Sequence, residues 1–108
     1  MHWIILFIAG LFETAFAICL GKASNVSGKE ALPWWIGFFV FLTISMVLLS
    51  IAVQKIPIGT AYAVWTGIGA TGTVILGILF FKEPAGFWRL FFITTLIISI
   101  IGLKFVSK

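Results

Sequence analysis

Four long apolar stretches divide the sequence, and short polar segments separate them. The apolar stretches cover residues 3–20, 34–53, 59–81 and 87–105. Each is close to the length of about 20 residues that an α-helix needs to cross the hydrocarbon core of a bilayer. The pattern predicts an all-α membrane protein with four transmembrane helices. Because little sequence remains outside these stretches, we expect residues 1–108 to form a single four-helix transmembrane domain.

The polar segments between the apolar stretches predict loops. Residues 21–33 are rich in Gly and Ser and end in Pro33, which is typical of a loop. The connection at 54–57 is short, and residues 82–84 (Lys-Glu-Pro) interrupt the chain before the last stretch. Most tryptophans stand at the ends of the apolar stretches, where aromatic residues meet the membrane–water interface. Trp65 is the exception, and this position makes it a candidate for a binding site.

Composition excludes several classes of protein. Hydrophobic residues make up 62% of the chain and charged residues 9%, against about 25% charged in a soluble domain, so a soluble enzyme is excluded. The net charge of +4 comes from residues at the ends of the apolar stretches, so membrane lipids are the expected partners and nucleic acid is not. His2 is terminal and no cluster of His, Cys and Asp stands within the apolar stretches, so we expect no metal and no cofactor.

Glu13 is the only charged residue within 3–20 and falls near the middle of that predicted helix. A charged carboxylate in the bilayer core costs about 3 kcal/mol on insertion scales, and such residues usually mark ion or substrate pathways. A carboxyl group is neutral when it holds a proton and attracts a cation when it is ionised. Glu13 is therefore predicted to exchange protons for a cation. A purely structural role, in which a protonated Glu13 links two helices by a hydrogen bond, is the alternative.

The neighbours of Glu13 on the same helix are small or aromatic. Ala9, Ala17 and Gly21 continue its stripe at intervals of four residues, and Gly10 and Phe16 stand three residues to either side. Small residues allow another helix or a ligand to approach closely.

The second and third apolar stretches supply the other candidate site residues. Ser45 lies near mid-span, where a hydroxyl bonds a backbone carbonyl or a neighbouring carboxylate. Tyr62 and Trp65 are three residues apart on one helical face, and their rings can hold a cation or donate hydrogen bonds, although simple core packing is the alternative. Gly67 and Gly69 place two helix-weakening residues within one turn and predict a point of flexure.

The charges at the ends of the four stretches are nearly balanced between the two sides of the membrane. If the N-terminus is inside, that side holds Lys55, Lys104 and Lys108, and the other side holds Lys22, Lys29, Lys82 and Arg89. The numbers of Lys and Arg on the two sides thus differ by one, and such a difference is what orients a protein in the membrane. We expect both orientations to occur, which permits an antiparallel dimer of identical chains.

The chain resembles the small multidrug resistance transporters in three places. These are Gly10 to Glu13, residues 57–70 (PIGTAYAVWTGIGA) and residues 80–84 (FFKEP), and the second is most similar to the guanidinium-exporter subtype. The resemblance implies a multi-pass antiporter of the bacterial inner membrane that works as an antiparallel, dual-topology homodimer, with protons entering as a small organic cation leaves. It places the essential carboxylate on Glu13, the binding residues on Gly10, Phe16, Ser45, Tyr62 and Trp65, and the flexible glycines on Gly67 and Gly69.

One departure from that family pattern bears on the substrate. Guanidinium exporters usually carry Trp where this chain has Phe16, and Phe lacks the indole N–H that would steady the carboxylate. We therefore expect guanidinium-like ions to be accompanied by small quaternary ammonium ions. Broad quaternary-ammonium efflux and service as one half of a heterodimeric pair are the alternatives within the family. A non-transporting membrane scaffold is the alternative from another class, and it leaves Glu13 unexplained.

Overall fold

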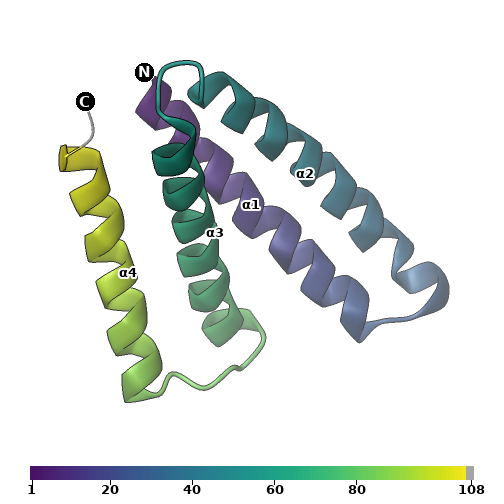
Figure 1. The fold of residues 1–108 in the computed structure, drawn as a ribbon. Helices are drawn as coiled ribbons and strands as arrows, with labels where there is room; N and C mark the ends of the chain where they lie inside the picture. The colour runs from purple at the N-terminus through teal and green to yellow at the C-terminus, as the bar shows by residue number, and fades with distance from the viewer. Residues whose placement is uncertain (107–108) are drawn as a thin grey trace.

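Four helices make up almost the whole structure, a computed structural model that describes residues 1–106 (Figure 1). They are α1 (His2–Asn25), α2 (Leu32–Ala52), α3 (Ile58–Phe80) and α4 (Phe87–Val106), with a short 3₁₀ turn at Gly28–Glu30. All four are long and apolar enough to cross a membrane, which confirms the prediction of an all-α membrane protein. Lys108, which enters the charge balance, lies outside the described residues.

The predicted loop at 21–33 is wrong in its extent. α1 continues to Asn25, and only residues 26–31 connect it to α2. The polar residues remain helical because their groups are satisfied locally: Ser24 Oγ donates to the Leu20 carbonyl, and Lys22 lies in the last turn, where a positive charge is favoured. Gly28 supplies the turn with a positive φ of 63°. Pro33 lies in the first turn of α2, where its missing N–H costs no hydrogen bond.

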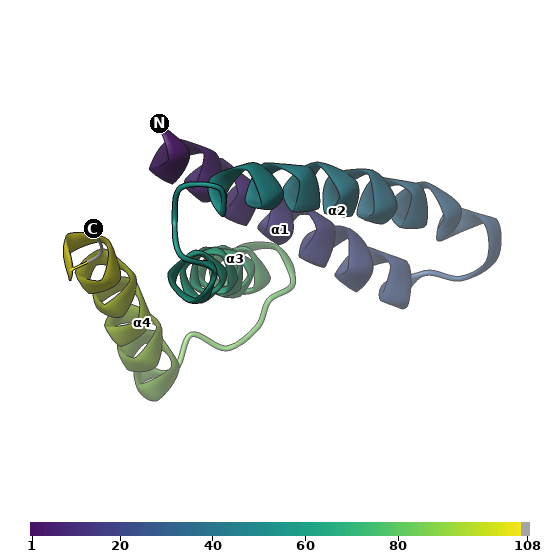
Figure 2. The same ribbon diagram turned by 45° about the horizontal axis from the view of Figure 1, so that its top comes forward.

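The helices are arranged around α1 and α3. α1 packs against both α2 and α3, whereas α4 packs chiefly against α3, on the side away from α1 and α2 (Figures 1 and 2). The beginning of α1 and the end of α4 lie at the same end of the bundle, where the ammonium group of Lys104 is 5.6 Å from the centre of the Trp3 ring.

The buried core occupies one end of the bundle, around the connection between α2 and α3. Its members come from α1, α2, α3 and that connection: Leu6, Ala9, Leu49, Ala52, Ile56, Ala61, Val64 and Trp65. Within the described part of α4, no residue is buried. The three helices that carry the candidate site thus share one core. α4 packs the partly buried Ile100 and Leu103 against the edge of this core and leaves most of its other apolar side chains exposed.

Glycines let α1 and α4 approach α3 closely. A Cβ at Gly10 would overlap Ile68 of α3, and a Cβ at Gly72 would overlap Thr14 of α1. A Cβ at Gly67 would lie 2.6 Å from Ile100 Cδ1 of α4. The small residues of α1 and α3 are therefore used for close helix packing, as their spacing predicts.

Candidate functional site

Glu13 lies half-buried on α1 with its carboxyl group against the backbone of α3 at Gly69. A Cβ at Gly69 would overlap Glu13 Oε1, so only glycine leaves room for the carboxyl group there. Glu13 Oε1 is buried and has no hydrogen-bond partner among residues 1–106. A buried carboxyl oxygen without a donor costs free energy, and such an atom marks a place where a proton or a cation is stabilising.

Ser45 connects three helices. Its side chain is fully buried on α2, its hydroxyl donates to the Ala9 carbonyl of α1 at 2.7 Å, and it accepts the indole N–H of Trp65 of α3 at 2.9 Å. Ala9 lies one helical turn before Glu13 on the same stripe of α1. The structure thus brings Ser45 and Trp65 together, and it links both to the helix that carries Glu13.

Tyr62 and Trp65 form a pair of rings with different surroundings. Their ring centroids are 5.5 Å apart and the planes are tilted by 47°. Trp65 is 6% exposed and Tyr62 is 55% exposed. Trp65 is therefore part of the core, with its N–H already bonded to Ser45, and Tyr62 is the member of the pair that remains open to an approaching ion.

Gly10 and Phe16 face different neighbouring helices. Gly10 is buried against Ile68 of α3. The ring of Phe16 packs edge-on against Phe38 of α2, with centroids 5.6 Å apart. Since the carboxyl group of Glu13 lies against α3, Phe16 and Glu13 point toward different helices within this chain.

The two glycines predicted to flex lie within one uninterrupted helix. α3 runs from Ile58 to Phe80 through both of them. Gly67 is approached by Ile100 of α4, and Gly69 is approached by Glu13 of α1. In this conformation both glycines serve close packing, and their flexure stays a prediction.

A polar cavity of about 420 Å³ begins one helical turn from Glu13, between the second halves of α1 and α3. Ala17 follows Glu13 by four residues and Thr73 follows Gly69 by four residues, and both line the cavity. Its other end is lined by polar side chains that include Ser24, Asn25 and Glu83. The cavity between α1, α3 and α4, of about 300 Å³, is by contrast lined mainly by apolar side chains.

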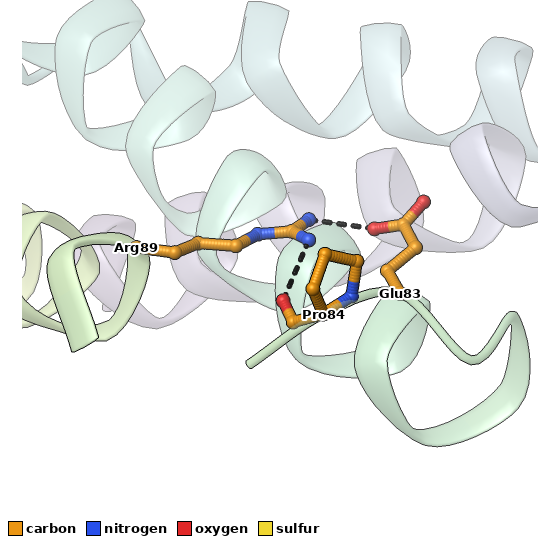
Figure 3. A network of polar contacts seen from close by, with 3 residues as sticks. All are labelled: Glu83, Pro84 and Arg89. Atoms are coloured by element: carbon orange, nitrogen blue, oxygen red, sulfur yellow. Dashed lines mark hydrogen bonds and ion pairs between the residues drawn. The ribbon is translucent and has the colours of Figure 1, made fainter. Parts of the chain in front are cut away.

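An arginine holds the acidic residue of the polar cavity in place. Arg89 Nη2 is 2.6 Å from Glu83 Oε1, and Arg89 Nη1 donates to the Pro84 carbonyl at 3.1 Å (Figure 3). These contacts tie the first turn of α4 to the segment that follows α3. Within residues 1–106, no group of three or more His, Cys, Asp or Glu side chains is placed to hold a metal ion.

Thr14 is a buried residue of this region that sequence reasoning missed. It is 6% exposed, and its hydroxyl donates to the Gly69 carbonyl at 3.2 Å. The spacing of four residues between Gly10 and Thr14 was a usable signal, because it places both on the face of α1 that approaches α3. A threonine inside a helix usually bonds a carbonyl of its own helix, so its bond to a neighbouring helix is not expected from the sequence.

Comparison with known proteins gives matches over essentially the whole chain. The family model described as "Small Multidrug Resistance protein" matches residues 1–97, a range that contains every site residue above. The guanidinium exporter of Proteus vulgaris is 45% identical over 99% of this chain and 100% of its own length. The guanidinium exporter of Yersinia pseudotuberculosis serotype I is 48% identical over the same shares. The probable guanidinium efflux system subunit GdnD of Bacillus subtilis is 40% identical over 99% of each chain.

Proposed function

The chain belongs to the small multidrug resistance family, and we propose that it exports guanidinium and related small organic cations across the bacterial inner membrane in exchange for protons. The observation that carries this proposal is the placement of Glu13. Its carboxyl group lies in the middle of a helix that can span the membrane, with one oxygen buried and without a donor. The names of the relatives supply the substrate class.

A single carboxylate is sufficient to couple the two flows. Protonation removes the charge that attracts the cation, so a proton and a cation compete for Glu13 in a medium of low dielectric constant. When the site faces the side with more protons, a proton displaces the cation, and when it faces the other side the cation displaces the proton. Competition alone then drives export against a gradient of the organic cation.

The other residues of the site have separate roles in this proposal. Ser45 and Trp65 fix the core against the stripe of α1 that carries Glu13, as their hydrogen bonds to Ala9 and to each other indicate. Tyr62, which is exposed beside Trp65, offers a ring face to the cation. The polar cavity at Ala17 and Thr73 gives Glu13 an approach for water and ions from one face of the membrane.

We further propose that residues 1–108 act as one domain of an antiparallel dual-topology homodimer. The difference of one charge between the two sides supports dual orientation. α4 has no buried residue among those described, so it has an apolar surface free for contact with a second copy. Within one chain, Glu13 is not surrounded by Gly10, Phe16 and Tyr62. A second chain completes the enclosure of its carboxyl group.

Two observations favour second candidates within the same family. Phe16, which lacks an N–H, favours broader acceptance of quaternary ammonium ions. The relative from Bacillus subtilis is named as a subunit of an efflux system, which favours a heterodimeric pair. The near-equal charge balance supports the homodimer over the pair. A membrane scaffold without transport gives no role to the buried carboxyl oxygen of Glu13.

The first test is the exchange of guanidinium for protons in liposomes. Glu13→Gln keeps the size of the side chain but cannot hold an exchangeable proton, so it should abolish proton release on addition of guanidinium. Glu30→Gln, in the exposed connection between α1 and α2, is the matched control and should behave as the parent. In the parent, guanidinium affinity should fall by up to about tenfold for each pH unit of acidification, because one proton competes with one cation. Robust proton release from the Glu13→Gln variant would reject the proposal.

A further inference from the structure

The hydroxyl group of Thr14 is enclosed between α1 and α3, directly beside Glu13 in the chain. It donates to the Gly69 carbonyl of α3 at 3.2 Å, and it lies 3.4 Å from the Gly10 carbonyl of its own helix. A Cβ at Gly72 would overlap this hydroxyl, so α3 approaches Thr14 closely at Gly72 as well as at Gly69.

This contact is the one side-chain hydrogen bond between α1 and α3 in the part of the chain that the structure describes. The other buried side-chain bonds between helices go through Ser45 of α2. The remaining α1–α3 contacts near Glu13 are van der Waals contacts at glycines, which have no directional preference. Thr14 therefore fixes the register of α3 against α1 at one point.

The acceptor, the Gly69 carbonyl, is shared by two side-chain hydroxyl groups. The Gly69 carbonyl accepts the hydroxyl of Thr73 at 2.7 Å as well as that of Thr14. A hydroxyl that bonds the carbonyl four residues before it competes with the helical N–H bond and favours bending. Gly67 and Gly69 add their low helix propensity to the same turn.

The carboxyl group of Glu13 touches the same residue. Gly69 is thus approached by Glu13 and by the hydroxyl of Thr14 from adjacent positions of α1. Movement of α3 at this turn has to break the Thr14 bond and change the surroundings of the carboxyl group together.

We propose that Thr14 is a positioning residue for transport: its hydroxyl holds Gly69 of α3 beside Glu13, and it is released when α3 flexes. The inference rests on the proposed function, since it assigns a role within the transport cycle. The hydroxyl is directed at a main-chain carbonyl and not at the cation. It therefore controls the rate at which the protein changes conformation, and it has little influence on cation affinity.

Thr14→Val tests the role, because valine keeps the shape and removes the donor. Thr14→Ser keeps the donor. Thr43→Val is the control, because the hydroxyl of Thr43 is exposed and bonds only the Phe39 carbonyl of its own helix. Two quantities are measured on each purified protein in bicelles: the rate of conformational exchange by nuclear magnetic resonance exchange spectroscopy, and the Kd for guanidinium by calorimetry.

Loss of one hydrogen bond predicts that exchange in Thr14→Val is faster by about twofold to tenfold, with a Kd within about twofold of the parent. Thr14→Ser should exchange at the rate of the parent, and so should Thr43→Val. If Thr14→Val does not fold, Thr14→Ala removes the same donor and leaves space, and the same acceleration is expected.

Three results would overturn the proposal. An unchanged exchange rate in Thr14→Val would mean that the hydroxyl serves only the Gly10 carbonyl of its own helix. A Kd that changes as much as the rate would place Thr14 in the binding site itself. A parent protein without conformational exchange would leave the bond nothing to control. Exchange is recorded without guanidinium or a proton gradient, so it is independent of the Glu13→Gln transport assay that tests the function.

Discussion

Phe16 is the single residue that we expect to bear most on substrate choice. Its ring is held edge-on against Phe38 of α2, and the resemblance to guanidinium exporters leads us to expect Trp at this position. Guanidinium is planar and presents fixed donors, so its recognition depends on acceptors that are held in a fixed geometry. A phenyl ring supplies neither a donor to steady the carboxylate nor an acceptor for the ion, but it offers a surface to alkyl groups.

Phe16→Trp should therefore narrow the range of substrates. The added N–H should raise the ratio of guanidinium to tetramethylammonium transport by roughly twofold to tenfold, the effect of one hydrogen bond. Phe12→Trp is the matched control, because Phe12 also packs on α2, with its ring centroid 5.9 Å from that of Phe41. Both ratios are measured by proton release in liposomes. Equal ratios in the parent and the Phe16→Trp variant would show that this position does not determine selectivity.

Candidate site residues were predictable where a polar residue interrupts an apolar run, but the burial and the contacts of their side chains were not. Glu13 and Ser45 were found because they interrupt apolar runs. Ser45 bonds a backbone carbonyl, one of the two alternatives expected for it, and this carbonyl belongs to α1 and not to its own helix. Tyr62 and Trp65 were correctly placed on one face, but the spacing did not show that one ring is buried and the other exposed. That difference depends on Ser45, which is 20 residues away in the sequence and adjacent in space.

At the scale of the element, the positions of the four helices followed from hydropathy, but their ends did not. α1 passes through residues that composition assigns to a loop, because a helix end depends on local hydrogen bonds such as that of Ser24 and not on polarity alone. In α3, the helix itself was predicted but the packing partners of its glycines were not. Gly67 and Gly69, which are two residues apart, face different partners, and sequence spacing alone did not identify those partners.

Substitution of these two glycines should therefore have unequal effects. In Gly69→Ala the methyl group displaces the carboxyl group of Glu13, which should weaken guanidinium binding by about 1–3 kcal/mol, the usual cost of overpacking. In Gly67→Ala the methyl group meets the end of the flexible Ile100 side chain, so binding should remain within about twofold of the parent. Calorimetric titration of both variants with guanidinium checks this. The same affinity in both variants would mean that Gly69 has no special relation to Glu13.

At the scale of the whole molecule, the even charge balance and the exposed α4 favour assembly of chains in opposite orientations. The described Lys and Arg residues of the connections lie at both ends of the bundle, and no large excess directs the chain one way. A dimer built in this manner needs both orientations to be populated. The sequence alone was sufficient for this proposal, since orientation follows the count of charges and not the packing of side chains.

Lysines added at one end of the bundle should fix the orientation of the chain in the membrane. Val26→Lys with Ser27→Lys adds two charges to the connection between α1 and α2, and Gln54→Lys with Ile58→Lys and Gly59→Lys adds three charges at the connection between α2 and α3. The first variant raises the count on its side from four to six against three, and the second raises the count on the opposite side from three to six against four. Each variant should therefore adopt mainly one orientation and lose guanidinium resistance when expressed alone. Co-expression of both variants should restore resistance. Full resistance from either variant alone would support a parallel assembly.

The uneven burial of the four helices has a consequence for biogenesis. A chain enters the membrane from its N-terminal end, and the buried core belongs to α1, α2, α3 and the connection between α2 and α3. These three helices can complete their shared core while α4 is still being translated, since none of the described residues of α4 is buried in it. α4 brings Arg89 near one end and Lys104 near the other, so it adds one charge to each side of the membrane. The last helix to be made therefore adds only partly buried side chains, Ile100 and Leu103, to the edge of that core, and it does not decide which way the chain faces. Most of its apolar surface is left for contact with a second chain.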